Sequence, residues 1–431
     1  MRRKIIKKIS GTGLIGIAQK AGQLLVSAIL ARSLGAEDYG VYAYALSVIV
    51  ILSLPINAGI QQVVIRETAT FELNHDWGLL KGLLQWSISV VLGISILVIS
   101  LSVGIVLFFI NDNSGILDPK TFMIAILALP IDSLSLIRTA LMRGLRHPVS
   151  AFLPEGIVLP WINIALILWL LLHERSLSPP HAMSARLLSS MISGFLGFIL
   201  VLKVIPKEVF SSHVNYHIKG WLSAIVPFTL FYGINLINTQ ADIIMLGFFR
   251  RPEEVGLYQS CIQLILPLSG IMLTINSVIS PYISRFYEQE NRAELAKIST
   301  LGARVSLFIF MPFCLIYIFK GQFILRNLYG DIFAQAAPAL MILSGATLVN
   351  VAFGPVATIL NMTRNENESL KGILLSAFFN LLANLIVIPR YGIIGAAITT
   401  LISYLIWNIF LWIRLRAKLG LDSSIVGFHS L

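Results

Sequence analysis

"LGAEDYGVYAYAL", residues 34–46, lies between two long apolar segments and returns in altered form as "RRPEEVGLYQSCI", residues 250–262. Four positions of the two phrases align at one constant separation of 216 residues: Glu37 with Glu253, Asp38 with Glu254, Gly40 with Gly256 and Tyr42 with Tyr258. This separation is about half of the 431-residue chain. The sequence therefore predicts two related halves, residues 1–210 and 211–431.

The composition is that of a membrane protein. Only 12% of the residues are charged and 56% are hydrophobic, whereas soluble domains carry about 25% charged residues. A membrane-spanning helix needs about 20 mostly apolar residues. Twelve segments meet this requirement: 12–32, 39–62, 82–110, 119–143, 149–172, 182–205, 221–247, 255–283, 298–318, 335–360, 370–388 and 391–413. The sequence thus predicts an all-α integral membrane protein.

The basic residues indicate the orientation of these helices. With both termini in the cytoplasm, most of the 32 Lys and Arg residues fall in cytoplasmic segments, as the positive-inside rule requires. Arg186 is assigned to the outer end of its span. Six crossings return the chain to its starting side, so the halves would be two parallel six-helix lobes around a central cavity, an architecture suited to alternating access. This distribution explains the net charge of +11, and no nucleic-acid partner is expected.

The opening phrase is expected to form the same outer hairpin in each half. Its acids would lie in a tight turn, and its glycine would permit the turn or close packing. Tyr39 and Tyr42 suit the membrane interface, where tyrosine is enriched.

Polar side chains recur inside two corresponding helices. Lys20, Gln19 and Gln23 lie in the first span, and Asn235 and Asn238 lie in the seventh. Gln23 aligns with a position of the seventh span under the same 216-residue separation. These groups either line an aqueous lumen and contact the substrate, or form hydrogen bonds between helices.

Further ionisable groups lie within the spans. Arg138 and Arg304 fall in the cytoplasmic half, where together with Lys20 they would attract an anionic group such as a phosphate; snorkelling to the interface is the alternative. Asp242 lies in the outer part of its span without an obvious local partner. It would bind a coupling proton or sodium ion, or form a structural ion pair. Glu155 is expected to be structural.

Catalytic and cofactor motifs are absent from the sequence. "GTGLIG" at 11–16 has the spacing of a dinucleotide-binding loop, but a membrane helix follows it and no strand precedes it. "HVNYH" at 213–217 offers two histidines without a third ligand. Both cysteines, Cys261 and Cys314, lie in apolar spans. We therefore expect no enzyme activity, no cofactor and no metal site.

Three stretches resemble a known family: "ARSLGAEDYGVYAYALSVIVILSLPINAGIQQVVIRET" (31–68), "ADIIMLGFFRRPEEVGLYQ" (241–259) and "YGIIGAAITTLIS" (391–403). They are similar to the bacterial polysaccharide-biosynthesis flippases of O-antigen or exopolysaccharide type, in the multidrug/oligosaccharidyl-lipid/polysaccharide exporter superfamily. The resemblance implies a V-shaped inner-membrane transporter that moves undecaprenyl-pyrophosphate-linked oligosaccharide to the periplasmic leaflet, ion-coupled and alongside other polysaccharide-assembly membrane proteins. Lys20 and Arg304 are the positions that would supply the cationic lumen typical of this family.

Two other functions compete with this interpretation. A multidrug or cation antiporter of the same superfamily would favour acidic groups in its lumen, whereas basic groups predominate among the inner candidates. A membrane-embedded glycosyltransferase or polymerase would need a catalytic acid or a large outer loop, and neither is present in the sequence. A lipid-linked sugar fits better, because its hydroxyls cannot cross hydrocarbon without hydrogen-bonding partners.

Overall fold

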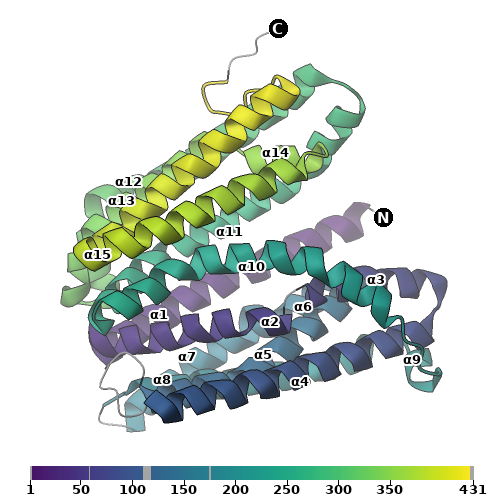
Figure 1. The fold of residues 1–431 in the computed structure, drawn as a ribbon, viewed down its shortest axis with the longest axis horizontal. Helices are drawn as coiled ribbons and strands as arrows, with labels where there is room; N and C mark the ends of the chain where they lie inside the picture. Colours follow the sequence, from purple (N-terminus) through teal and green to yellow (C-terminus); the bar gives the residue numbers. More distant parts are fainter. Residues whose placement is uncertain (1, 58, 110–117, 174–175, 428–431) are drawn as a thin grey trace. The chain divides into compact units, whose positions relative to one another are not determined.

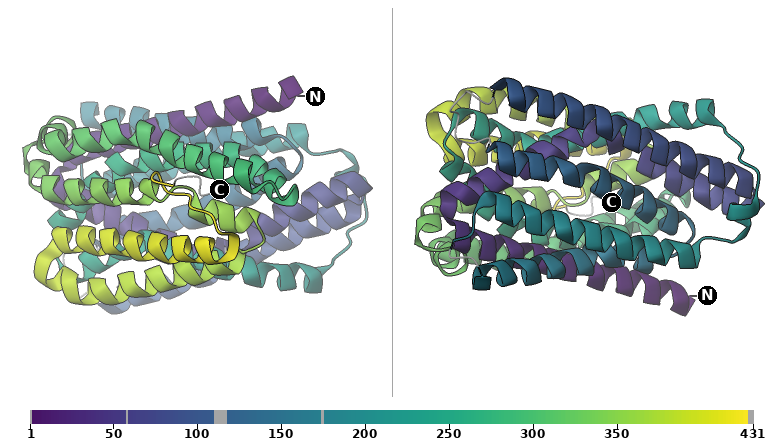
Figure 2. Two further views of the ribbon diagram at one scale, coloured as in Figure 1. Left: turned by 90° about the horizontal axis from the view of Figure 1, so that it is seen from above. Right: turned by 90° about the horizontal axis from the view of Figure 1, so that it is seen from below.

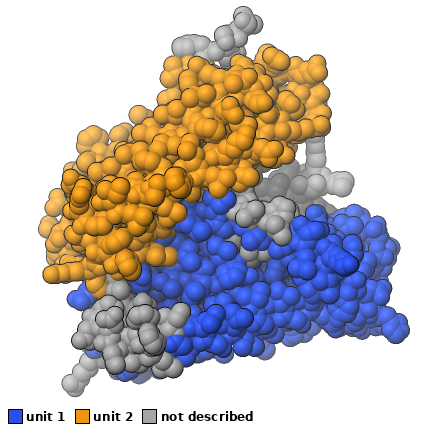
Figure 3. All heavy atoms as spheres, in the orientation of Figure 1, with its two compact units in different colours: residues 1–240 blue, residues 241–431 orange. Residues whose placement is uncertain are grey.

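The computed structural model describes residues 2–57, 59–109, 118–173 and 176–427, and within these ranges every regular secondary-structure element is a helix (Figure 1). The chain divides into two compact units, Met1–Gln240 and Ala241–Leu431, coloured separately in Figure 3. Each unit is a bundle of long helices, which can be followed from two further sides in Figure 2.

Unit 1 contains ten of the labelled α-helices and one π-helical turn. Their bounds are α1 Arg2–Leu52, α2 Leu54–Asn57, α3 Ile60–Asn74, α4 Trp77–Phe109, α5 Pro119–Gly144, α6 Pro148–Leu153, η1 Pro154–Val158, α7 Leu159–His173, α8 Pro179–Val204, α9 Glu208–Ser211 and α10 Ile218–Phe249, whose last residues enter unit 2. Within unit 1, α5 packs against α3, α4 and α8, and α1 packs against α7.

Unit 2 contains the remaining elements. Their bounds are α11 Pro252–Glu288, α12 Arg292–Tyr329, the 3₁₀ turn η2 Asp331–Ala336, α13 Ala337–Ala352, α14 Val356–Met362 and α15 Glu366–Leu419. Here α12 packs against α11 and α13, and α13 packs against α15. Ile283, Val356 and Leu411 belong to one fully apolar cluster of this unit.

Nine helical segments within the described ranges are long and apolar enough to cross a membrane. Several consist of more than one element: α6, η1 and α7 form one such segment, and η2, α13 and α14 form another. The sequence-based assignment to the all-helical membrane class is therefore confirmed. This is a multi-pass membrane protein.

Two of these segments contain two predicted spans each, bent at a glycine. In α1 the helix is interrupted at Gly35, with φ 82° and ψ 175°, inside the opening phrase. In α15 the interruption is at Gly392, with φ 54° and ψ −133°. A side chain on either residue would be strained, because L-amino acids rarely adopt positive φ.

In the second copy of the phrase, a break between two helices occurs at the matching position. α10 ends at Phe249 and α11 begins at Pro252, with Arg251 in an extended conformation at φ −73° and ψ 154°. Arg251 lies 216 residues after Gly35, so both halves turn at the same point of the phrase. One turn uses a left-handed glycine and the other an extended arginine.

The tyrosines of the phrase lie in the interior of the bundle rather than on its surface. Tyr39 and Tyr42 are buried, with Tyr39 only 2% exposed, and in the second half Tyr258 is 1% exposed. The Tyr39 hydroxyl lies 2.6 Å from the Ser27 hydroxyl. A buried tyrosine is stable where its hydroxyl finds such a partner, so these rings fill the bundle interior.

The boundary between the compact units lies inside α10, later than the predicted division at 210/211. The segment before α10 and the first turns of α10 pack on unit 1. The Asn215 amide donates to the Gly78 carbonyl at 3.0 Å, and the Trp221 ring lies 5.4 Å from that of Trp86. Trp221 is 1% exposed, so the burial of this large ring ties the start of α10 to α4.

Candidate functional site

Unit 1 encloses a polar cavity of about 350 Å³. Its walls come from α1, α2, α5, η1, α7 and α8. Six of the lining residues carry amide, carboxylate or guanidinium groups: Gln19, Gln23, Asn57, Asp132, Glu155 and Arg186. Serines from α5 and α8 add hydroxyls. A cavity with this lining is unusual within a bundle whose composition is mostly apolar.

The first helix brings its predicted polar face to this cavity. Gln19 and Gln23 both line it. The Lys20 ammonium donates to Gln23 Oε1 at 3.4 Å, which places the lysine beside the same wall. Lys20 has no carboxylate among the ion pairs of the described residues. Among the described residues, the charge of Lys20 is therefore compensated only by the Gln23 amide oxygen.

Arg186 of α8 is a cavity residue that the sequence pattern did not single out. Its Nη2 lies 3.1 Å from Asp132 Oδ2 of α5, and its Nη1 donates to the Ser190 hydroxyl. The topology assigned Arg186 to the outer end of a span, where a cation is ordinary. The sequence pattern that could have identified it is helical spacing, which puts Arg186, Ser190 and Ser193 on one face of α8. All three line the cavity.

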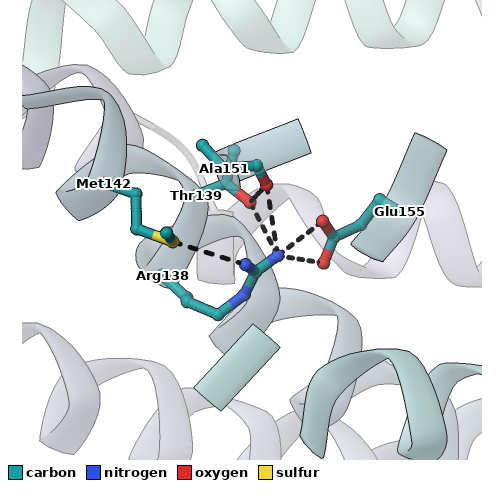
Figure 4. Close-up of polar contacts among 5 residues, drawn as sticks. All are labelled: Arg138, Thr139, Met142, Ala151 and Glu155. Carbon is teal, nitrogen blue, oxygen red and sulfur yellow. Dashed lines mark hydrogen bonds and ion pairs between the residues drawn. The ribbon is translucent and has the colours of Figure 1, made fainter. Parts of the chain in front are cut away.

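A second ion pair joins Arg138 of α5 to Glu155 of η1 (Figure 4). Arg138 Nη2 donates to both carboxylate oxygens of Glu155 and to the Thr139 hydroxyl at 3.1 Å. The Ala151 carbonyl, 3.5 Å from the same nitrogen, and the Met142 sulfur complete the surroundings. Arg138 is 8% exposed. Its charge is thus neutralised locally.

Two local features of the backbone position this pair. Pro154 has no N–H, and it opens a π-helical turn that carries Glu155. On the other side, Gly197 of α8 leaves room for the guanidinium, because a Cβ there would lie 2.5 Å from Arg138 Cζ. The expectation that Glu155 is structural agrees with this geometry.

Unit 2 holds a separate polar cluster around Asp242. The carboxylate is 8% exposed and accepts three hydrogen bonds: from the Tyr258 hydroxyl at 2.8 Å, Asn384 Nδ2 at 2.7 Å and the Thr400 hydroxyl at 2.6 Å. The partners of Asp242 come from other helices: Tyr258 of α11 is 16 residues along the chain, and Asn384 and Thr400 of α15 are 142 and 158 residues away.

The cluster extends further along α15. Asn384 Nδ2 also donates to Asn380 Oδ1 at 3.0 Å, and the Thr399 hydroxyl donates to Asn384 Oδ1. None of the ion pairs formed by the described residues includes Asp242. Two of the stretches that carry the family resemblance, 241–259 and 391–403, meet here through Asp242, Tyr258 and Thr400. The cluster is a carboxylate surrounded by neutral oxygen and amide groups.

The other predicted site residues lie elsewhere. Arg304 is exposed on α12, and its Nε donates to the Ile425 carbonyl at 3.4 Å. Asn235 and Asn238 are partly buried on the portion of α10 that belongs to unit 1. The structure thus brings Gln19, Gln23 and Lys20 together, and it leaves Asp242 in a cluster of its own.

The two sites differ in their chemistry. The unit 1 cavity offers amides, hydroxyls and two ion pairs, which can form hydrogen bonds with a ligand rich in hydroxyls or anionic oxygens. The Asp242 cluster offers a carboxylate and several oxygen atoms, the ligands that hard cations prefer. Within the described ranges, no three His, Cys, Asp or Glu side chains gather as a metal site would require.

Comparison with known proteins places the chain in a family. Residues 5–287 match the sequence model of the family described as polysaccharide biosynthesis protein. An uncharacterized membrane protein of Methanocaldococcus jannaschii is 26% identical over 407 residues, covering 90% of this chain and 79% of the relative. The probable low-salt glycan biosynthesis flippase Agl15 of Haloferax volcanii is 23% identical over 164 residues, covering 38% of this chain and 34% of the relative.

Solved structures share the fold at low sequence identity. An inward-facing multidrug resistance MATE family transporter of the MOP superfamily superposes with a TM-score of 0.76 at 15% identity, covering 96% of this chain and 98% of the other. The lipid II flippase MurJ, in an inward closed conformation, superposes with a TM-score of 0.73 at 16% identity, covering 94% and 87%. Because the family match spans well over half of its residues, the chain belongs to the polysaccharide biosynthesis protein family, and its fold is that of the MOP superfamily transporters.

Proposed function

We propose that this protein is a flippase for a lipid-linked oligosaccharide. It moves an undecaprenyl-pyrophosphate-linked glycan, of O-antigen or exopolysaccharide type, from the cytoplasmic to the periplasmic leaflet of a bacterial inner membrane. The observation that carries the proposal is the polar cavity of unit 1, present in a chain of the polysaccharide biosynthesis protein family. The name of the Haloferax relative and the fold shared with a lipid II flippase support it.

The chemistry of the cavity suits such a substrate. Each sugar hydroxyl that enters hydrocarbon without a partner costs several kcal/mol, on the order of 2–7. Side chains such as Gln19 and Gln23 supply replacement hydrogen bonds, so the head group can cross while the polyprenyl chain stays in an apolar environment. This lowers the barrier without any covalent step.

The proposed architecture has twelve crossings, six in each of the halves 1–210 and 211–431, around a central cavity. α1 and α15 each provide two crossings on either side of their glycine bends, and α10 provides another. Both termini are cytoplasmic. Alternating access then exposes the cavity first to one leaflet and then to the other.

We assign the substrate contacts to amides and cations of this cavity and to residues elsewhere in the two units. Lys20 attracts the pyrophosphate, because the Gln23 amide oxygen compensates its ammonium only in part. The remaining assigned contacts are Gln19, Gln23, Asn235, Asn238, Arg138 and Arg304. Arg138 contributes through its ion pair with Glu155 rather than as a free charge.

Transport is coupled to a proton or a sodium ion at Asp242. The support is a buried carboxylate that has hydroxyl and amide neighbours and no cationic side chain as an ion-pair partner among the described residues. A carboxylate in such surroundings gains by taking up a positive ion. The neighbouring oxygens of Thr400, Tyr258 and Asn380 can then turn toward that ion.

A multidrug antiporter is the rival function, and the fold alone does not decide between them. The charges around the cavity favour the glycan, because Arg186 and Arg138 pair with Asp132 and Glu155 and Lys20 adds a further positive charge. A cation-binding lumen would carry a net negative charge.

The test is glycan export in a strain that depends on this protein. Lys20→Ala combined with Arg304→Ala should reduce surface glycan about tenfold or more, the effect of losing on the order of 1.4 kcal/mol of transition-state stabilisation. Lys207→Ala, which removes an exposed lysine before α9, is the matched control and should export normally. Wild-type export by the double variant, at equal membrane abundance, would overturn the cationic contacts; drug resistance without glycan export would favour the antiporter.

A further inference from the structure

Unit 1 also contains an apolar groove of about 690 Å³, formed by α4, α5, α8 and α9. This volume is within the range of about 300–1,000 Å³ typical of pockets for organic ligands. Ile88, Phe195, Phe198 and Phe210 contribute exposed apolar surface to its walls. Arg138 is the only ionisable side chain among the described residues that line it.

The groove and the polar cavity share one wall. Ser135 of α5 lines both. On α8, Ser190 and Ser193 line the cavity, whereas Met191 and Gly194 line the groove. α5 and α8 therefore present polar side chains to the cavity and mostly apolar side chains to the groove.

The ion pair of Figure 4 passes through this wall. Arg138 lines the groove and its partner Glu155 lines the cavity. The polar and apolar compartments thus lie on the two sides of the packed α5–α8 wall, and one charged pair and one serine reach both sides.

Unpartnered donors lie on both sides of the wall. Arg138 Nε is buried and has no hydrogen-bond partner within the described part of the chain. The hydroxyls of Ser133 and Ser193, each 1% exposed and lining the cavity, are also without one. Buried donors are normally satisfied, so such a group at a pocket indicates an acceptor that arrives with a ligand.

We infer that these two compartments form a single binding site for an amphiphile, in which the groove holds the polyisoprenoid chain of the carrier lipid and the cavity holds the diphosphate and first sugars. The inference rests on the proposed function. The shared α5–α8 wall selects the chain of the substrate itself, because that chain is covalently attached to a head group that requires the adjacent cavity. Ser135 and Arg138 lie where head group and chain join.

The groove acts by positioning the chain. In a bilayer an apolar chain gains little from leaving lipid for an apolar protein surface. A defined groove fixes the direction of the chain instead, so that the diphosphate enters the cavity beside α5. Filling the groove should therefore displace the chain while leaving the polar cavity intact.

The experiment uses the full-length protein in phosphatidylethanolamine–phosphatidylglycerol vesicles with an undecaprenyl diphosphate that carries a diazirine near the middle of its chain. After illumination, labelled peptides are identified by mass spectrometry. We expect labelling within 191–202 of α8, suppressed by unlabelled undecaprenyl diphosphate and not by additional phosphatidylglycerol. Met191→Trp should reduce it about tenfold, which corresponds to about 1.4 kcal/mol.

Ile192→Trp is the matched control. Ile192 is the adjacent residue on the same helix, is 40% exposed and does not line the groove. It should label like the wild type. Gly194→Trp, which fills the groove from its floor, provides a second variant in case one substitution reduces folding, which thermal unfolding measures.

Three outcomes would overturn the inference: labelling outside the groove, suppression by phosphatidylglycerol that equals suppression by the polyprenyl lipid, and equal labelling of Met191→Trp and Ile192→Trp. Translocation of a lipid-linked oligosaccharide is measured in the same vesicles. Translocation without groove labelling would contradict the assignment of the groove to the polyprenyl chain, but not the proposed function. Specific groove labelling without translocation would contradict the proposed function, but not the existence of a binding site for an amphiphile.

Discussion

At the scale of single residues, Asp242 is the clearest example of a charge whose role depends on tertiary partners. It lies 8% exposed, with the Tyr258 hydroxyl, Asn384 Nδ2 and Thr400 hydroxyl donating to it. Three donors compensate the desolvation of a carboxylate without removing its charge. Under the proposed coupling, this carboxylate takes up the proton or sodium ion.

Asp242→Asn should uncouple transport from the ion gradient. The amide keeps the size and most hydrogen-bonding capacity of the carboxylate, but it cannot take up a proton and binds sodium weakly. Glycan translocation in vesicles with an imposed proton or sodium gradient should lose its dependence on that gradient. A variant that still responds to the gradient as the wild type does would place the coupling site elsewhere. Asp331→Asn, at a surface ion pair with 85% of the side chain exposed, is the control.

The Arg138–Glu155 pair predicts an asymmetric effect on stability. Glu155→Ala leaves a guanidinium that is 8% exposed without its counter-ion, and breaking such a pair costs about 3–5 kcal/mol. The double change Arg138→Met with Glu155→Leu removes both charges and should cost less than the single change. Thermal unfolding in detergent measures both. A double variant less stable than Glu155→Ala would show that the pair itself stabilises the fold.

Asp422, beyond the end of α15, predicts a pH dependence in the acid range. Burial raises its pKa, but hydrogen bonds from Trp412, Ser424 and Arg416 outweigh burial and hold the pKa at about 2. The unfolded value is about 3.9. Because the pKa of Asp422 is lower in the folded state, its ionised carboxylate stabilises the fold at pH values above the unfolded pKa. This stabilisation is lost as the pH falls from about 4 to about 2.

Hydrogen exchange of residues 420–427 should therefore accelerate, after correction for the intrinsic rate, as the pH falls through this window. The segment docks through Ile425, whose amide donates to the Ala352 carbonyl at 3.0 Å, and through the Ser423 hydroxyl, which donates to the Phe353 carbonyl at 2.9 Å. Asp422→Asn should exchange faster already at neutral pH and show a flatter profile. Identical profiles for the variant and the wild type would refute the role of the carboxylate.

At the scale of elements, the two glycine bends divide long helices at defined points. The Gly392 bend also explains one acid of the echoed phrase, Glu254. Glu254 pairs with Arg250 at 2.8 Å, and Arg250 Nη1 donates to the Pro389 carbonyl at 3.3 Å, so the phrase secures the bend of α15. A Cβ on Gly392 would overlap the Glu254 Oε2 atom.

Alanine substitutions at the bends should separate backbone strain from steric conflict. Gly35→Ala meets no atom within 4 Å, so its cost is the backbone strain alone, about 1–3 kcal/mol. Gly392→Ala adds the conflict with Glu254 and should be the less stable of the two. Gly93→Ala, in the regular part of α4 with open space around it, should stabilise by about 0.5–1 kcal/mol. Thermal unfolding of the three variants gives the order, and equal stability of all three would contradict it.

At the scale of the whole molecule, composition and internal repetition were the predictable features. The low charge content identified a membrane protein, and the separation between Glu37 and Glu253 placed the same turn in both halves. Gln19 and Gln23 stood out as polar residues within an apolar span, and both line the cavity. These features depend on neighbours in the chain or on a repeated phrase, which a sequence displays directly.

The features that the sequence did not reveal depend on distant pairs. Asp242 meets Asn384 and Thr400 across 142 and 158 residues, and Arg186 meets Asp132 across 54. No local pattern specifies such partners. The burial of Tyr39 was missed for a related reason, because an amphipathic ring suits both an interface and an interior where Ser27 bonds its hydroxyl.

The most direct test of the central claim is translocation by the purified protein. Proteoliposomes containing a fluorescent undecaprenyl-pyrophosphate-linked oligosaccharide are treated with an impermeant quencher, which reaches the outer leaflet alone. We predict that wild-type protein makes nearly all of the lipid accessible and that Lys20→Ala combined with Arg304→Ala slows this about tenfold or more, with Lys207→Ala unaffected. Accessibility limited to the initial outer-leaflet fraction with wild-type protein, equal to that of protein-free vesicles, would contradict it.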